Sequence, residues 1–477
     1  MAKIHIPTVS KHHRGLRLML ALKKDPLRFF IHLMNQKGAY AWLKTAGGPF
    51  LMVNDAAAIK YILQTNPTGF RKGRFQQFLK PIFGKSIFLT EGDMWRRQRE
   101  NAAPVFANGN FDEMVRQMVA AMNAMFARWD RKAEQNKTID LTLEMTSFTL
   151  DALLRTLFHE ATSDVADNMR STMDVMLTDA ENRVWSGLTL PPFIAHRLPK
   201  YARAKKFLGE IVQGLIDARR ANRAYPEDLL SRLIAHYASP GEEQSILHDE
   251  VLAFLLSGHD TTSHALCWTF YVLAHQPVHH KLMADEVSNI LGDKPPSAND
   301  LKKLKYTRQI FDEVLRLYPP VWAMSREAAK DCEIPLDDGA KISVPAGAGI
   351  MMCHYAVHRR EKYWENPEAF DPNRFLPEQT EQRIPFTWFP FGGGPRICIG
   401  FRFAQLESAV ALSMITQRYE LSLIPGQKIE ARPIITLRPS TAMLFNIKKR
   451  NNEGFLEKAA APKESVYETK CPFHKVA

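Results

Sequence analysis

The chain has 477 residues, of which 45% are hydrophobic, and this is long enough for one large domain with a smaller lobe. It carries 63 Lys and Arg against 51 Asp and Glu, a formal net charge of +12. Because basic and acidic residues are interspersed, the charge predicts a basic surface and gives no indication of nucleic-acid binding.

The N-terminal segment, residues 1–30, is basic but lacks a long apolar run. Its longest run, Leu18–Leu22, lies between Arg17 and Lys23 and is too short for a signal-peptide core or a membrane span. The five cysteines are widely spaced and include no CxxC pair, which argues against a disulfide framework and a zinc knuckle. We therefore expect a cytoplasmic protein without a membrane span.

Most of the chain has helical periodicity. Residues 52–64 and 112–160 are predicted to be helices, and residues 165–235 a further helical stretch broken by prolines. A long apolar segment follows at residues 246–275 and stops at Pro277. Roughly thirty helical residues span about 45 Å, so this helix should cross a whole domain.

The middle of this long helix is polar, which excludes a membrane span and requires another explanation. The polar residues are Gly258, His259, Asp260, Thr261 and Thr262. A metal site built from the histidines of this region is not favoured, because Pro277 interrupts the helix between His275 and His279, which have i, i+4 spacing.

The strands form a minor component. Residues 341–358 are predicted to form short strands and turns, and "ELSLIPG" and "AMLFNIK" a strand pair near the C-terminus. The polar residues 451–477 are predicted to be a disordered tail. The sequence thus predicts a mainly α fold over residues 31–450, with a large helical domain and a small β-rich lobe.

The segment "FGGGPRICIG", residues 391–400, places Cys398 in a glycine-rich turn before a helical run. A helix N-terminus favours a thiolate, and glycines allow close approach of the backbone. One cysteine cannot complete a structural zinc site, so the metal this loop suits is one held by a macrocycle, namely heme iron. The alternative for the loop alone is a buried cysteine with no ligand role.

Two further pairs lie on predicted helices. Trp95 and Arg99, at i, i+4, can present an indole N–H and a guanidinium to one anion, and heme propionates are such anions. Glu313 and Arg316 are three residues apart, and an ordinary solvated helix pair is the alternative for them.

Together these motifs resemble the cytochrome P450 superfamily over about residues 30–450. The loop at 391–400 matches that family's F-x-x-G-x-R-x-C-x-G at every fixed position. The resemblance implies the mainly helical P450 fold with heme b (iron protoporphyrin IX) and Cys398 as its proximal thiolate. It also implies propionate contacts from Trp95, Arg99, Arg326 and Arg396, and a buried network of Glu313, Arg316 and Arg374 that braces the heme loop.

On the distal side, the family pattern of small residue, glycine, any residue, acid and threonine matches residues 257–261, with Ser257 as a mild departure. The resemblance implies that Thr261 hydrogen-bonds the activated oxygen and that Asp260 relays protons to it. Gly258 is expected to weaken the helix so that a bulge makes room for O₂ and water.

The function implied is a monooxygenase that inserts one atom of O₂ into a hydrophobic small molecule of the fatty-acid, terpenoid or steroid class. Electrons are expected from a ferredoxin or flavodoxin with its own NAD(P)H reductase, as in soluble bacterial members. The expected pocket walls are residues 70–90, 183–199, 321–324 and 440–442. The alternatives are a peroxide-driven or isomerising heme-thiolate enzyme and a non-catalytic heme sensor.

Overall fold

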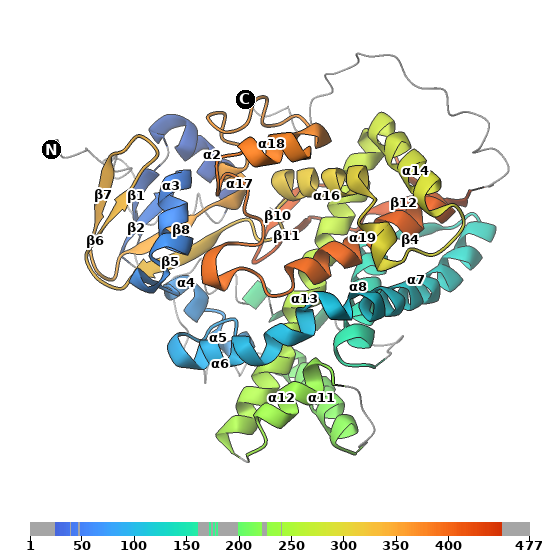
Figure 1. Ribbon diagram of the computed structural model, residues 1–477, viewed down its shortest axis with the longest axis horizontal. Helices are drawn as coiled ribbons and strands as arrows, with labels where there is room; N and C mark the ends of the chain where they lie inside the picture. The colour runs from blue at the N-terminus through green and yellow to red at the C-terminus, as the bar shows by residue number, and fades with distance from the viewer. Residues whose placement is uncertain are drawn as a thin grey trace.

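The computed structural model describes residues 24–450, apart from residues 39, 46–47, most of 161–198, 222–226 and 240. The described chain is mainly helical, with a β-rich region at one end (Figure 1). This confirms the predicted mainly α fold with a small β-rich lobe. The predictions for residues 1–23 and for the tail 451–477 concern residues outside the described part of the chain. No helix in the described part of the chain is long and apolar enough to cross a membrane.

The larger helices form most of the molecule, and short helices lie mainly in its connections. The larger ones are α2 (Pro26–Lys37), α6 (Gly92–Ala102), α7 (Phe111–Glu134), α8 (Leu141–Leu157), α11 (Pro199–Ala221), α12 (Leu229–His236), α13 (Glu242–His275), α14 (Pro277–Leu291), α16 (Lys305–Leu317) and α19 (Phe401–Arg418). The short ones are α3 (Ala56–Lys60), α4 (Arg74–Gln77), α5 (Lys80–Phe83), α15 (Ala298–Leu301), α17 (His354–Val357) and α18 (Pro377–Gln382).

The β-rich region is a five-stranded sheet in the order β1-β2-β8-β5-β3, in which only β2 and β8 are parallel. Its strands are β1 (Tyr40–Thr45), β2 (Gly48–Val53), β3 (Phe70–Arg71), β5 (Met324–Ala328) and β8 (Gly349–Met352). Pairing of Arg326 on β5 with Ile350 on β8 fixes the position of this arginine.

Three smaller sheets accompany it. They are the hairpin β6 (Cys332–Pro335) with β7 (Lys341–Val344), the hairpin β10 (Ala431–Pro433) with β11 (Leu437–Pro439), and β4 (Thr138–Asp140) with β12 (Leu444–Lys449) and β9 (Tyr419–Leu423). The antiparallel pairing of β9 with β12 confirms the strand pair predicted near the C-terminus.

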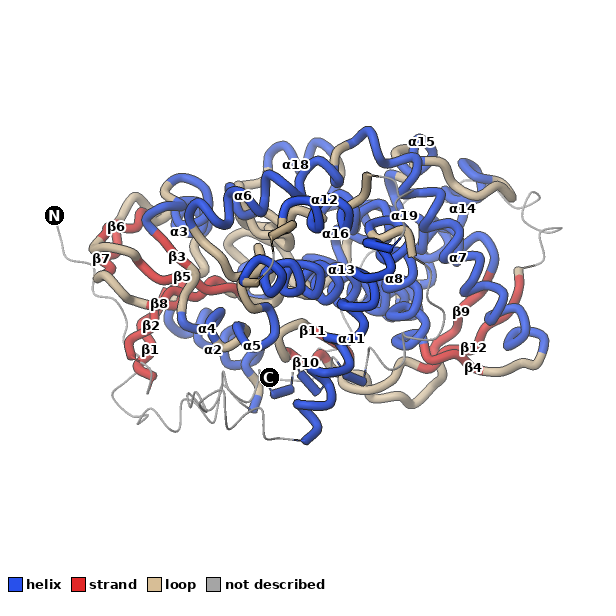
Figure 2. The backbone as a smooth tube through the Cα atoms, turned by 90° about the horizontal axis from the view of Figure 1, so that it is seen from below, coloured by secondary structure: helices blue, strands red, loops and turns tan. Residues whose placement is uncertain are grey.

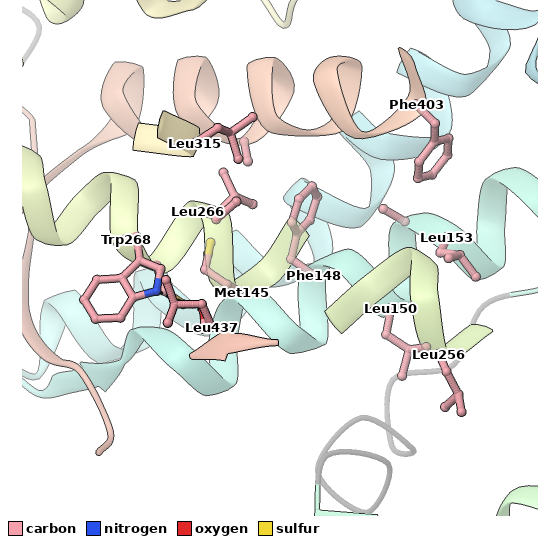
Figure 3. Close-up of a cluster of buried hydrophobic side chains, with 14 of the residues drawn as sticks. Met145, Phe148, Leu150, Leu153, Leu256, Leu266, Trp268, Leu315, Phe403 and Leu437 are labelled. Atoms are coloured by element: carbon pink, nitrogen blue, oxygen red, sulfur yellow. Dashed lines mark hydrogen bonds between the residues drawn. The ribbon is translucent and has the colours of Figure 1, made fainter. Parts of the chain in front are cut away.

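Helix α13 is the centre of the molecule. It has 34 residues and crosses the middle of the fold between other helices (Figures 1 and 2). Apolar residues on all its sides pack against α8, α16, α19 and β11, as Figure 3 shows for Leu256, Leu266 and Trp268. A helix that is apolar all round is stable only when it is enclosed in this way.

The bulge expected at Gly258 is absent, because α13 is a continuous α-helix through this residue. The glycine serves close packing instead. A Cβ at Gly258 would lie 2.1 Å from Leu153 Cδ1 of α8, so only glycine lets the two helices approach this closely.

Two predicted helices have different boundaries. The segment 52–64 begins as the end of β2, and α3 starts only after Asp55, whose side chain accepts a hydrogen bond from Ala58 N. The segment 112–160 is two helices, α7 and α8, because Asn136 has a positive φ of 49° and β4 then pairs with β12. Tertiary strand pairing overrides helical periodicity at both places.

Two other predicted segments are partly confirmed. Within residues 165–235, α11 and α12 are helical, whereas most of 165–198 lies outside the described residues. Within residues 341–358, β7 and β8 are strands as predicted, but α17 forms a short helix after Cys353.

Two acidic side chains of α13 accept hydrogen bonds from the backbone of residues 85–87, in the connection between α5 and α6. Asp249 Oδ2 accepts a hydrogen bond from Lys85 N at 2.8 Å, and Glu250 Oε1 accepts one from Ile87 N at 3.2 Å. Glu250 is buried, and its second oxygen has no hydrogen-bond partner. Burial raises the pKa of Glu250, the hydrogen bond from Ile87 N lowers it, and the charge of Asp249 raises it, so that the pKa is about 8.

This shift predicts a pH-dependent stability. At pH values between the ordinary pKa of a glutamate and about 8, Glu250 keeps a proton in the folded protein that the unfolded chain releases. The contribution of Glu250 to the free energy of unfolding therefore falls as pH rises and is lost above pH 8. Relative to Glu250→Gln, the wild type should lose up to about 1.4 kcal/mol of unfolding free energy per pH unit across this window. Denaturant unfolding from pH 5 to 9 measures the difference. Glu210→Gln, at an exposed carboxylate of α11, is the control, and parallel pH curves for wild type and Glu250→Gln would contradict the prediction.

Candidate active site

One cavity of about 480 Å³ brings together all the site residues predicted from the sequence. They come from α6, α13, β5 and the loop before α19, which are far apart along the chain. The residues are Trp95, Arg99, Asp260, Thr261, Arg326, Arg396 and Cys398.

Glycines shape the loop that carries Cys398. Gly394 has a φ of +64°, and a Cβ there would lie 1.8 Å from the Leu63 carbonyl oxygen. At Gly393 a Cβ would lie 2.3 Å from the Phe386 ring. Cys398 N donates a hydrogen bond to Phe391 O at 2.9 Å, and α19 begins at Phe401, so the cysteine lies just before a helix N-terminus as predicted.

The Cys398 thiol is exposed to the cavity, although protein surrounds it deeply. Burial raises its pKa, while the Gly400 N–H and the positive charge of Arg99 lower it. Arg99 also donates from Nη1 to the Ile397 carbonyl oxygen at 2.7 Å, next to the cysteine in the chain. A thiol in such surroundings is deprotonated when it coordinates a metal ion.

Four cations line the same cavity, namely Lys72, Arg99, Arg326 and Arg396. Burial lowers the pKa of Lys72 well below its usual range, and the charges of Arg396 and Arg326 lower it further. Burial together with the charge of Arg396 also lowers the pKa of Arg326, to about 10. Positive charges buried this closely repel one another, so this region suits an anionic ligand.

The orientation of these cations follows from their neighbours. The Arg396 guanidinium lies 4.3 Å from the centre of the Trp95 ring, donates to the Thr90 carbonyl oxygen at 3.0 Å and is 3.6 Å from Glu91 Oε1. The backbone N–H of Lys72 donates a hydrogen bond to the same Glu91 oxygen at 2.7 Å. The sequence analysis included residue 72 only in the expected wall 70–90 and did not identify Lys72 as one of the cations of the site, because this lysine lies in no motif.

The donor set fits heme. A thiol and a group of cations with an indole N–H line one cavity, as needed for an iron ligand and for two propionates. Cys398 would hold the metal, and Lys72, Trp95, Arg99, Arg326 and Arg396 would hold the propionates. Within the described residues no three His, Cys, Asp or Glu side chains are grouped to hold a metal ion by themselves.

Thr261 lies on the turn of α13 that lines the cavity. Its hydroxyl donates to the Ser257 carbonyl oxygen at 3.0 Å, and the Ser257 hydroxyl donates to Ala253 O at 2.5 Å. Because a hydroxyl has one proton and two lone pairs, Thr261 keeps the ability to accept a hydrogen bond from a molecule in the cavity.

Asp260 is held by partners on both carboxylate oxygens. Oδ1 is 2.8 Å from Arg438 Nη2 and 3.4 Å from His264 Nε2, and Oδ2 accepts a hydrogen bond from Thr436 at 2.8 Å. Burial alone would raise the pKa of Asp260, but the charge of Arg438 and the proximity of His264 hold it well below its usual range. Neither Arg438 nor Thr436 was predicted from the sequence.

The rest of the cavity wall is mainly apolar. The expected walls at 70–90 and 321–324 line it, whereas 183–198 lies outside the described residues. The expectation for 440–442 is wrong, because the tip of the β10–β11 hairpin supplies the wall a few residues earlier. The apolar lining includes Leu79, Phe83, Ile87, Phe88, Phe254, Trp322, Ile434 and Ile435.

The Glu313–Arg316 pair is fully buried, so the solvated alternative is wrong. Arg316 Nε and Nη2 donate to the two Glu313 oxygens at 2.7 and 2.8 Å, and Arg374 Nε is 3.6 Å from Glu313 Oε1. Removing one member of such a pair strands a buried charge and costs about 3–5 kcal/mol.

Comparison with known proteins agrees with this geometry. The family model described as Cytochrome P450 matches residues 11–445. The chain is 31% identical over 397 residues to rat cytochrome P450 4A14 (78% of this chain, 76% of the relative). It is 27% identical over 428 residues to cyclooctatin synthase of Streptomyces melanosporofaciens (88% and 90%), and 27% identical over 423 residues to the chloroplastic protein LUTEIN DEFICIENT 5 of Arabidopsis thaliana (83% and 70%). The chain therefore belongs to the cytochrome P450 family, and is an oxidoreductase of the monooxygenase class.

Proposed function

We propose that the protein binds heme b through Cys398 and inserts one atom of O₂ into an apolar molecule of the fatty-acid, terpenoid or steroid class. The observation that carries the proposal is the single cavity lined by the Cys398 thiol, four cations, the Asp260–Thr261 turn and an apolar wall. Heme bound there supplies the redox-active iron at which O₂ is activated. A cavity with this wall favours an enzyme over a sensor.

The side chains of this chain have distinct parts in that reaction. The apolar wall binds the substrate and excludes bulk water. Thr261, whose proton is donated to Ser257 O, would accept a hydrogen bond from an O–H group in the cavity and so hold it in place. Asp260, a carboxylate while it is paired with Arg438 and Thr436, would help relay protons from solvent toward the cavity. The cations would hold the heme propionates.

Electrons are proposed to come from a ferredoxin or flavodoxin with its own NAD(P)H reductase. Arg96, Arg97 and Arg402 are exposed on α6 and α19, the two helices next to the Cys398 loop, and offer a basic docking face for an acidic partner. A cytoplasmic location is part of the proposal and rests on the spacing of the five cysteines.

The first prediction from this proposal concerns the thiolate. Reduced wild-type protein under CO should show the strongly red-shifted Soret band of thiolate-ligated heme, and Cys398→Ser should lose it, because a hydroxyl is a far weaker iron ligand. Cys332→Ser on β6, at a partly exposed cysteine, is the matched control and should keep the band. Retention of the band in Cys398→Ser would mean that another residue binds the iron.

The second prediction concerns Thr261. Without the hydroxyl, the reduced oxygen is not held for protonation and leaves as hydrogen peroxide, formed from O₂, two electrons and two protons. Thr261→Ala should therefore keep the heme spectrum, consume NAD(P)H and O₂, and release much of the oxygen as peroxide. Asp260→Asn should slow turnover as a whole, within the range of about 10²–10⁴-fold typical of positioned proton transfer. Product formation as efficient as in wild type for Thr261→Ala would favour the peroxide-driven alternative.

The third prediction concerns the docking face. The Debye length falls from ~10 Å at 0.1 M to ~3 Å at 1 M salt, so first-electron transfer from an acidic ferredoxin should slow sharply as salt rises. The Arg96→Glu/Arg97→Glu double variant should transfer slowly at low salt and depend less on salt. Lys428→Glu/Lys448→Glu, at two exposed lysines near the C-terminus, is the control for net charge. Transfer that does not respond to salt would indicate an apolar docking site.

A further inference from the structure

Two polar side chains, Lys72 and Gln76, lie side by side in the chain with apolar wall residues and line the same cavity. Their segment, which leads into α4, runs close to β5, because a Cβ at Gly73 would lie 3.1 Å from the Arg326 carbonyl oxygen. Gln76 Nε2 donates to the Ser325 carbonyl oxygen at 2.8 Å, and the Ser325 hydroxyl donates to Gln76 Oε1 at 2.8 Å. The Gln76 amide is thus held in place, and this bond uses only one of its two N–H donors.

The Lys72 ammonium lies against the apolar part of the wall. Its Nζ is 3.5 Å from the Ile87 carbonyl oxygen and 5.4 Å from the centre of the Phe88 ring, and both residues line the cavity. Among the described residues, Glu91 is the one acid whose charge acts on Lys72. Glu91 Oε1, however, accepts the Lys72 backbone N–H at 2.7 Å and is 3.6 Å from Arg396 Nη2. In the described part of the chain the ammonium therefore has no acidic partner of its own.

The charges in the cavity leave a place for a further anion. Four cations line it, namely Lys72, Arg99, Arg326 and Arg396. Glu91 and the two propionates of the proposed heme together balance three of them, and Asp260 is already paired with Arg438. Burial and the charges of Arg396 and Arg326 disfavour the charged form of Lys72, which lowers its pKa well below the usual range. A third anion bound beside Lys72 would favour that charged form.

We propose that Lys72 and Gln76 bind the carboxylate of the substrate, so that the substrates of this enzyme are amphiphilic acids. The ammonium would donate a charge-assisted hydrogen bond to one carboxylate oxygen, and the second N–H of Gln76 would donate to the other. The apolar body of the acid would lie along Leu79, Phe83 and Phe88 of the same wall. The inference rests on the proposed function, and selects from the apolar molecules named there those that end in a carboxylate.

Binding to the heme-loaded protein, measured by titration calorimetry, tests the inference. Decanoic acid is compared with methyl decanoate, and a diterpene acid with its methyl ester. Each ester has the same apolar body without the charge, so wild type should bind the acid of at least one pair about tenfold or more tightly than its ester. The pair that shows the difference identifies the body that the cavity accepts. Equal affinity for acid and ester in both pairs would overturn the inference.

Lys72→Met replaces the ammonium with an uncharged side chain of similar length. It should weaken binding of the preferred acid about tenfold or more and leave binding of the ester unchanged, whereas Lys72→Arg should keep the preference. Lys80→Met, the same change at an exposed lysine of α5, is the control and should bind both compounds as wild type does. A wild-type preference for the acid in Lys72→Met would contradict the proposal.

A second variant keeps the test decisive if Lys72→Met holds heme poorly. Gln76→Glu puts a carboxylate of the protein where that of the substrate would bind, and like charges repel. Binding of the acid should fall about tenfold or more, while the ester should bind as in wild type. Undiminished binding of the acid by Gln76→Glu at full heme content would rule out this carboxylate site.

The CO band, recorded first for wild type and each variant, separates this inference from the proposed function. Absence of the red-shifted band from wild type would overturn the proposed function and the inference with it. A normal band with oxidation of the neutral esters, and no preference for either acid, would overturn the inference alone.

Discussion

The buried guanidinium of Arg316 is the interaction on which the shape of the active site depends. Besides Glu313, it donates to the carbonyl oxygens of His358 at 2.9 Å, Pro367 at 2.6 Å and Ala369 at 2.9 Å. Nε2 of the His358 ring accepts a hydrogen bond from Phe389 N. The Phe389 carbonyl oxygen in turn accepts a hydrogen bond from Gly392 N. A continuous set of bonds thus leads from α16 to the loop of Cys398, so a charge that water cannot reach holds the loop in place.

Charge is distributed in the cavity according to what each region must bind. The region of Lys72, Arg326 and Arg396 carries more positive charge than nearby carboxylates balance, which is costly for the protein alone and favourable once an anion binds. In the cluster of Asp260 and Arg438 the charges balance within the protein. The first arrangement suits a bound anionic cofactor, whereas the second is complete without a further ligand.

Helix α13 connects these features because it is enclosed on all sides. Its polar turn lines the cavity, while neighbouring turns pack against α8, α16 and α19 (Figure 3). Gly258 allows α8 to approach at this turn, so the backbone position of Thr261 is set by helix packing. Rigid placement of this kind is what a site for oxygen chemistry requires, since a small displacement of a reacting group costs much of the rate.

The sequence by itself determined the local features: the helical character of the chain, the glycine loop of Cys398, and the spacing of Trp95 with Arg99 and of Glu313 with Arg316. These depend on residues close together in the chain, where backbone conformation and helical periodicity decide which side chains share a face. Only the tertiary structure decided that Glu313 and Arg316 are buried, that Lys72 joins the cations, and that Arg438 and Thr436 hold Asp260. It also divided the helix predicted over 112–160 into two after Glu134, because β4 (Thr138–Asp140) pairs with β12 near the C-terminus. Burial and pairing between distant segments are properties of packing, and a periodic pattern in one segment contains no information about which partner covers it.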